Sequence, residues 1–148
     1  MKKFLTLALI LTLFLVSSFS LGTSPSYAYS QSDLDRLLKT RMCLGCDLSG
    51  ANLDYAFLIN ANLQGANLED AFLIDANLQG ANLEGANLKG AILQSAILSD
   101  ANLQGANLQG ANLEDAFLID ANLSGANLSG VSLEGASLSG ANLSGAIQ

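Results

Sequence analysis

Two cysteines are the residues of this chain best suited to chemistry. Cys43 and Cys46 are separated by two residues, as in a C-x-x-C motif, and no other cysteine is present among the 148 residues. The chain has no histidine, which is the commonest acid–base catalyst and metal ligand near neutral pH. Its absence excludes Ser–His and Cys–His catalysis, and two cysteines alone cannot complete a zinc site. We therefore expect no enzyme activity, no bound metal and no cofactor.

The cysteine pair has three interpretations. If the chain is exported, a disulfide between Cys43 and Cys46 is expected to fasten an N-terminal cap to the rest of the fold. The second interpretation is a pair of reduced, buried cysteines. The third is a thioredoxin-like thiol-redox pair. It is disfavoured because that chemistry places the first cysteine at the start of a helix, whereas here the motif follows the expected helix.

Acidic residues outnumber basic residues in the chain. There are 13 Asp and Glu residues against 6 Lys and Arg residues, which gives a formal net charge of -7. Such a charge repels nucleic-acid phosphates and anionic membranes, so we expect no nucleic-acid partner. Neighbouring acids such as Glu69 and Asp70, or Glu114 and Asp115, lack the dense ligand set of a calcium loop. We interpret the acids as a solvated surface that keeps the protein soluble.

The first 28 residues have the pattern of an export signal. Lys2 and Lys3 precede an apolar run that ends at Val16, and small residues lie around Ala28. The run is shorter than the roughly 20 residues that span a bilayer, and this arrangement is typical of a cleaved signal peptide. We predict that residues 1–28 are removed, which leaves no stable membrane anchor; an uncleaved anchor is the alternative. The mature protein is then expected in the periplasm or, in a photosynthetic cell, in the thylakoid lumen.

A five-residue repeat fills most of the remaining chain. From Cys46 to Gly145 the sequence divides into 20 units without insertion or deletion, of which ANLQG is typical. The third residue of every unit is leucine, and the first is alanine except at Cys46 and Val131. Residues two apart point to the same side of an extended chain, so the chain must turn once per unit to bury both. Four such turns predict a square coil, and five coils stacked at about 4.8 Å would form a rod roughly 24 Å long.

This pattern resembles the pentapeptide-repeat family, whose consensus is close to A(D/N)Lxx. The resemblance covers Cys46 to Gly145 and implies an all-β solenoid over residues 46–148. The implied fold is a right-handed quadrilateral β-helix with the first and third residues of each unit inside. The alternative of low-complexity disorder is disfavoured because disordered segments lack a regular core-forming leucine. The core leucines that we single out are Leu48, Leu53, Leu58, Leu63, Leu68, Leu83, Leu103, Leu123 and Leu143.

Residues 29–45 are expected to cap the first coil, because the open end of a β-helix exposes unpaired backbone groups. Ser32 is the expected N-cap of a helix, since acidic residues follow it and basic residues lie at the other end. We predict a short amphipathic α-helix from Asp33 to Thr40. Its apolar face is expected to contain Leu34, Leu37 and Leu38.

Residues 20 apart stack on the same wall of a four-sided coil. On two walls the second residue of almost every unit is asparagine, and stacked amides can hydrogen-bond along the axis. The outward apolar residues of the other two walls are Tyr55, Phe57, Ile59, Phe72, Ile74, Ile92, Ile97, Phe117 and Ile119. They are either tolerated substitutes that pack on one another, or a surface for docking or self-association. The stretch ANLEDAFLIDANL occurs at Ala66 and again at Ala111, and such copying favours the first interpretation.

Three classes of function remain. The first is a non-enzymatic structural or protein-interaction module outside the cytoplasm, which binds an unidentified protein partner or a second copy of itself. The second is a DNA-mimicking acidic rod, because some cytoplasmic members of the family resemble DNA in shape and charge and bind topoisomerases. The export signal argues against this second class. The third is a thiol-redox protein that uses Cys43 and Cys46. The first class is our prediction.

Overall fold

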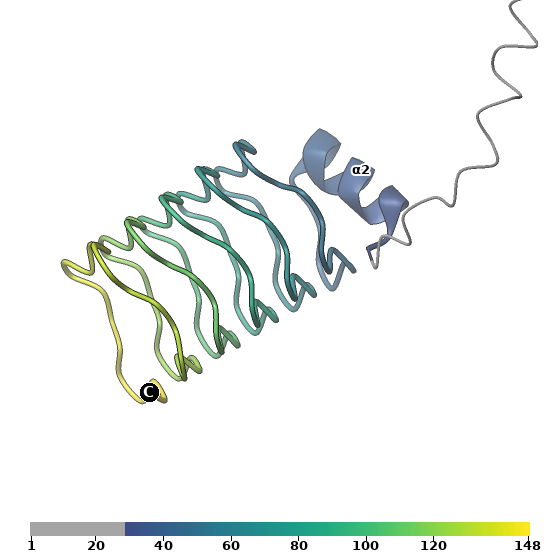
Figure 1. The fold of residues 1–148 in the computed structure, drawn as a ribbon. Helices are drawn as coiled ribbons and strands as arrows, with labels where there is room; N and C mark the ends of the chain where they lie inside the picture. Colours follow the sequence, from purple (N-terminus) through teal and green to yellow (C-terminus); the bar gives the residue numbers. More distant parts are fainter. Residues whose placement is uncertain (1–28) are drawn as a thin grey trace, which may run out of the picture.

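The computed structural model describes residues 29–148, so the predicted signal peptide lies outside the described residues. The helix of this part, α2, spans Gln31–Thr40. After it the chain winds into coils that are stacked along one axis, with α2 across one end and the C-terminus at the other (Figure 1). Within residues 29–148 no helix is both long and apolar enough to cross a bilayer.

Each five-residue unit consists of one short extended segment and one tight turn. The backbone N–H of the residue that starts a unit donates to the carbonyl of the preceding leucine, as from Ala51 N to Leu48 O at 3.0 Å. This bond closes a β-turn whose third residue has a positive φ, for example 67° at Gly50. Glycine adopts this conformation without steric cost, which explains why glycine so often ends the unit.

Four units complete one coil. Parallel bridges join residues that are 20 positions apart, such as Asn82 and Asn102. This bridge consists of two bonds between coils: Leu83 N donates to Asn102 O at 2.7 Å, and Asn102 N donates to Ala81 O at 2.9 Å. Because a turn follows every bridge, the bridges stay isolated and do not extend into longer strands.

Alanine and leucine side chains fill the axis of the coil. Burial of one such leucine contributes roughly 1.5–3 kcal/mol of transfer free energy. The following leucines singled out from the sequence are buried: Leu48, Leu53, Leu58, Leu63, Leu68, Leu83, Leu103 and Leu123. Leu143 differs, because 37% of its surface is exposed. It lies in the last described coil, where no further coil covers it, so its assignment to the core is wrong.

The coil begins one unit earlier than predicted. Met42 forms a parallel bridge with Asn62, and Cys43 is fully buried. Residues 41–45 therefore belong to the first coil. This unit is hard to recognise in the sequence because Arg41 and Cys43 stand where the other units have alanine and leucine.

Helix α2 begins two residues before the predicted start. Ser30 is its N-cap, since the Ser30 hydroxyl oxygen accepts a backbone N–H of the first turn at 3.3 Å. The prediction of Ser32 as the cap is therefore wrong. Leu34 and Leu37 are buried and continue the core of the coil, whereas Leu38 is exposed. Successive residues lie about 100° apart around a helix, so Leu38 points away from the face that the other two leucines share.

Candidate interaction surface

The four walls of the coil differ in the second residue of their units. One asparagine wall carries Asn62, Asn82, Asn102, Asn122 and Asn142. The other asparagine wall carries Asp47, Asn67, Asn87, Asn107 and Asn127. The Phe72 wall carries Asn52, Phe72, Ile92, Asn112 and Ser132. The Phe57 wall, which follows it along the chain, carries Phe57, Asn77, Ile97, Phe117 and Ser137.

Side-chain amides form ladders along the asparagine walls. Asn87 Nδ2 donates to Asn67 Oδ1 at 3.1 Å, and Asn107 Nδ2 donates to Asn87 Oδ1 at 3.1 Å. Asn87 Oδ1 also accepts the backbone N–H two residues further on, from Lys89 N at 3.3 Å. The predicted stacking of amides is confirmed. Asparagine at this position therefore has a structural role, because it bonds one coil to the next.

Asp47 begins one of these ladders. Its Oδ1 accepts from the Ser49 hydroxyl at 2.9 Å, from Ser49 N at 3.3 Å and from Asn67 Nδ2 at 3.1 Å. The side-chain and backbone hydrogen bonds from Ser49 hold the pKa of Asp47 below its ordinary value, because they stabilise the charged form. This carboxylate is thus engaged in the ladder.

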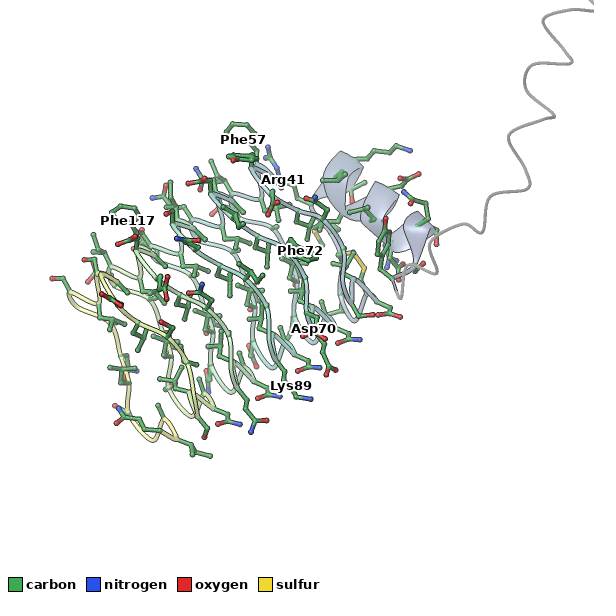
Figure 2. The ribbon with its side chains drawn as sticks, in the orientation of Figure 1. Arg41, Phe57, Asp70, Phe72, Lys89 and Phe117 are labelled. Carbon is green, nitrogen blue, oxygen red and sulfur yellow. A yellow bond between two sulfur atoms is a disulfide. The ribbon has the colours of Figure 1, made fainter. Side chains whose placement is uncertain are left out.

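Three large apolar side chains are exposed on the Phe57 wall. The exposed fraction is 74% for Phe57, 47% for Phe117 and 39% for Ile119. Ile59 and Ile97 on the same wall are half-buried. Phe57 and Phe117 lie along the same side of the coil in Figure 2. Since neither phenylalanine nor isoleucine has a side-chain amide, this wall lacks the amide ladder of the asparagine walls.

The other predicted apolar residues lie on the Phe72 wall or at its corner. Phe72 and Tyr55 are exposed, whereas Ile74 and Ile92 are half-buried. Tyr55 ends a unit of the Phe72 wall, so it occupies the corner that this wall shares with the Phe57 wall. The nine candidates are therefore divided over two walls, and the Phe57 wall carries the larger exposed group.

Four more exposed apolar residues lie outside the predicted sets. They are Ile147 in the last coil, Leu38 on α2, and the pair Met42 and Leu44 in the first unit. Met42 and Leu44 could have been predicted by recognising residues 41–45 as an additional unit, because they then occupy its outward second and fourth positions.

Acidic side chains follow the corners of the coil. The fifth residue of each described unit has a positive φ, and at eight of these positions it is not glycine. Aspartate tolerates this conformation better than most residues that carry a side chain. Five of the eight residues are aspartates: Asp70, Asp75, Asp100, Asp115 and Asp120. The backbone conformation thus accounts for the position of these charges, which the sequence pattern alone does not explain.

The two cysteines lie where α2 meets the first coil. Cys43 and Cys46 form a disulfide, and both residues are buried. Arg36 Nη2 lies 2.9 Å from Asp33 Oδ1 and 2.8 Å from Cys46 Sγ. Asp33 Oδ2 in turn accepts from Asp47 N at 3.0 Å. These contacts fasten α2 over the end of the coil.

Comparison with protein families identifies the repeat. The family described as Pentapeptide repeats (8 copies) matches residues 43–80, 73–110 and 106–145, which together make up more than half of the chain. The chain belongs to the pentapeptide-repeat family. Membership implies a right-handed quadrilateral β-helix, and the 20-residue spacing of the bridges agrees with four sides of five residues.

This pentapeptide-repeat protein is similar to solved structures from cyanobacteria. The pentapeptide repeat protein Rfr23 from Cyanothece 51142 is 38% identical over 78% of this chain and 97% of its own, with a TM-score of 0.63. The pentapeptide repeat protein alr5209 from Nostoc Pcc 7120 is 32% identical over 77% of this chain and 95% of its own, with a TM-score of 0.63. No protein with a curated description matches the chain.

Within residues 29–148, no three acidic or sulfur-bearing side chains lie close enough together to hold a metal ion. The Phe57 wall differs from walls built of the typical unit ANLQG by its exposed phenylalanines. We therefore take the Phe57 wall as the candidate functional site.

Proposed function

We propose that this pentapeptide-repeat protein is a non-enzymatic interaction module that presents the Phe57 wall to a protein partner outside the cytoplasm. The observation that carries the proposal is the exposure of Phe57, Phe117 and Ile119 on one wall. Exposed apolar side chains gathered on one face mark interaction sites in soluble proteins, and aromatic residues are enriched at protein interfaces. Asn77 and the half-buried Ile97 lie between Phe57 and Phe117 on this wall.

The competing interpretation is that these side chains only pack on one another along the wall. Such packing would gain stability by removing apolar surface from water. Phe57 keeps 74% of its surface exposed, so it gains little in this way. The segment AFLI occurs at Ala56, Ala71 and Ala116, so copying of repeats accounts for the origin of the phenylalanines. Copying explains how the phenylalanines arose, but it does not explain why Phe57 and Phe117 remain exposed to solvent.

Export of the chain is the second part of the proposal. The predicted signal peptide, residues 1–28, supports it, and so does the Cys43–Cys46 disulfide, because disulfides persist in oxidising compartments. The destination is the periplasm or the thylakoid lumen. Mass spectrometry of the protein isolated from its source cells tests this directly, and we expect an N-terminus at Tyr29. A cytoplasmic protein with Met1 in place would contradict it and favour the DNA-mimicking alternative.

The interaction surface is tested by a comparative pull-down from the native compartment. The bait is the mature protein, and the variant is Phe57→Asn/Phe117→Asn/Ile119→Asn. We expect the variant to lose partners that the bait captures. Asn already occupies the second position of the asparagine walls, so the two changes at this position suit the fold. Phe72→Asn on the neighbouring wall is the control and should keep those partners. Identical partner sets for bait and triple variant would end the proposal.

The thiol-redox alternative makes a different prediction. It requires turnover of a dithiol substrate that is lost in Cys46→Ser. We expect no turnover by either protein, because both sulfurs are buried beneath α2 and no acid–base histidine is present.

A further inference from the structure

Each long edge of the Phe57 wall has aspartate at two of its five corners. The corner that it shares with the Phe72 wall carries Asp75 and Asp115, and the opposite corner carries Asp100 and Asp120. All four residues are exposed. Phe117 therefore lies between Asp115 and Asp120, whereas the corners beside Phe57 carry Tyr55 and Asn60.

Charge is distributed unevenly around the coil. Seven of the eleven acidic residues from Cys46 onward belong to units of the Phe57 and Phe72 walls, and none of those units contains Lys or Arg. The coil has two cations. Lys89 is on an asparagine wall, where its Nζ lies 3.0 Å from Glu69 Oε1, and Arg41 begins the first unit, near Phe57 in Figure 2. Figure 2 shows Lys89 near Asp70, away from Phe57 and Phe117. The carboxylates beside the phenylalanines thus have no cation within their own walls.

We infer that the Phe57 wall binds a protein segment that carries lysine or arginine beside apolar side chains. This inference rests on the proposed function and names the chemistry of the partner. Apolar side chains of the segment would cover Phe57, Phe117 and Ile119, and its cations would face the aspartates on either edge. Complementary charge of this kind favours encounter with the right partner and disfavours wrong ones.

The geometry of the wall sets the minimum length of the segment. Phe57 and Phe117 are three coils apart, which corresponds to about 14 Å at the usual spacing between strands. An extended segment rises about 3.3 Å per residue, so roughly four residues cover the distance between the two phenylalanines. A segment of eight to twelve residues would cover the whole wall.

The same charges disfavour other occupants. A second copy of this chain docked through the same wall would place aspartates against aspartates, and like charges across an interface are repulsive. Nucleic acid is excluded in the same way, because its phosphates are also negative.

The inference is tested with a peptide probe and the mature protein, residues 29–148. The probe is a fluorescein-labelled peptide of twelve residues. It contains four lysines, four leucines and four serines, with a serine after each lysine–leucine pair. Its counterpart has glutamate in place of every lysine. Fluorescence anisotropy is expected to detect binding of the lysine peptide and none of the glutamate peptide. Between 50 and 500 mM NaCl we expect the affinity to fall by roughly threefold to tenfold, because salt screens exposed charges.

Matched variants locate the binding site. Asp100→Asn/Asp120→Asn removes two charges from one edge of the Phe57 wall, and asparagine tolerates the positive φ at both positions. We expect this variant to bind the lysine peptide about threefold to tenfold more weakly, as for the loss of two exposed ion pairs. Glu69→Gln/Glu84→Gln removes the same charge from the asparagine walls and should leave the affinity unchanged. Circular dichroism of each variant must match that of the parent protein.

Four results would overturn the inference. They are failure of the lysine peptide to bind, equal binding of the glutamate peptide, equal weakening by the two double variants, and dimerisation in sedimentation experiments that is lost in Phe57→Asn. Failure here is distinguishable from failure of the proposed function. If the triple asparagine variant loses its partners in the pull-down while the lysine peptide does not bind, the Phe57 wall is an interface for a partner of different chemistry.

Discussion

At the scale of single residues, the fifth position of each unit is decided by backbone conformation. Every described unit ends with a positive φ, from 54° at Asp75 to 72° at Gly145. Left-handed backbone costs a residue with a side chain roughly 1–2 kcal/mol, which is why glycine, aspartate and asparagine dominate this position. The two exceptions are Ser95, with a φ of 57°, and Tyr55, with a φ of 60°. Tyr55 is exposed at the corner of the Phe57 wall.

Gly85→Val tests this explanation. We expect it to lower the free energy of unfolding by about 1–2 kcal/mol. Nothing lies within 4 Å of the Cβ that the substitution adds, so the added Cβ itself makes no clash, and the expected loss comes from the backbone. Gly85→Asn is the matched control, and its loss should be less than half as large. Urea unfolding measures both, and equal losses would refute the conformational explanation.

The ladder carboxylate Asp47 makes stability depend on pH. Hydrogen bonds from Ser49 lower the pKa of Asp47 in the folded protein, so its contribution is fully present above the unfolded pKa of about 4. It is lost as the pH falls below that value through the folded pKa. We expect the free energy of unfolding to fall less between pH 7 and pH 3 in Asp47→Asn than in the parent protein. The same fall in both would contradict this role.

At the scale of elements, α2 is held on the first coil by Asp33, Arg36 and two buried leucines, and the disulfide joins two units of that coil beneath it. Ser30 N donates to Asp47 O at 2.9 Å, and the Asp33 carboxylate accepts from Asp47 N at 3.0 Å. Both backbone groups of Asp47 are thus used by the cap. The cap covers an edge that would otherwise expose unpaired backbone groups.

Removal of the disulfide tests how much the cap depends on it. Cys43→Ala/Cys46→Ala is expected to lower the free energy of unfolding by about 2 kcal/mol, the value for a cross-link that closes a loop of about four residues. Hydrogen exchange should become faster in α2 than at Leu83 in the middle of the coil. As a control, the parent protein is treated with a reducing agent, which should lower its free energy of unfolding by a similar amount. Unchanged stability in the double variant would show that the cap holds without the bond.

The coil could be predicted from the sequence in more detail than helix α2. Twenty leucines in phase predict the turns, the four walls and the amide ladders, because a single spacing dictates all three. The start of α2 is not predictable in this way, since Ser30 and Ser32 are both suitable caps and the choice depends on Asp47, which is distant in sequence. The exposure of the apolar candidates is likewise a result of packing, which leaves Phe57 exposed but Ile59 half-buried.

At the scale of the whole molecule, the fold separates stability from recognition. Alanine and leucine along the axis and amides on two walls hold the coil together, so the other two walls are free to carry apolar side chains. The units of those two walls also carry seven of the eleven acidic residues of the repeats. A structural scaffold and a distinct surface are thus built from the same five-residue unit.

Substitution of a leucine in the middle of the coil and of one in the last coil tests whether the stacked core provides the stability. Leu83→Ala is expected to cost about 2–5 kcal/mol of unfolding free energy, because a buried leucine leaves a cavity. Leu143→Ala should cost much less, since the side chain is already 37% exposed in the last described coil. Thermal and urea unfolding measure both variants. Equal losses would contradict the view that stacking of coils stabilises the molecule.

The most direct test of the central claim, that the Phe57 wall is a docking surface, is hydroxyl-radical footprinting by mass spectrometry. Oxidation of Phe57 and Phe117 is compared between the purified mature protein and the protein in an extract of its native compartment. We predict that both phenylalanines are protected in the extract, while Met42 and Leu44 near α2 oxidise equally in both samples. Equal oxidation of Phe57 and Phe117 in the two samples, or protection only at Met42 and Leu44, would contradict the claim.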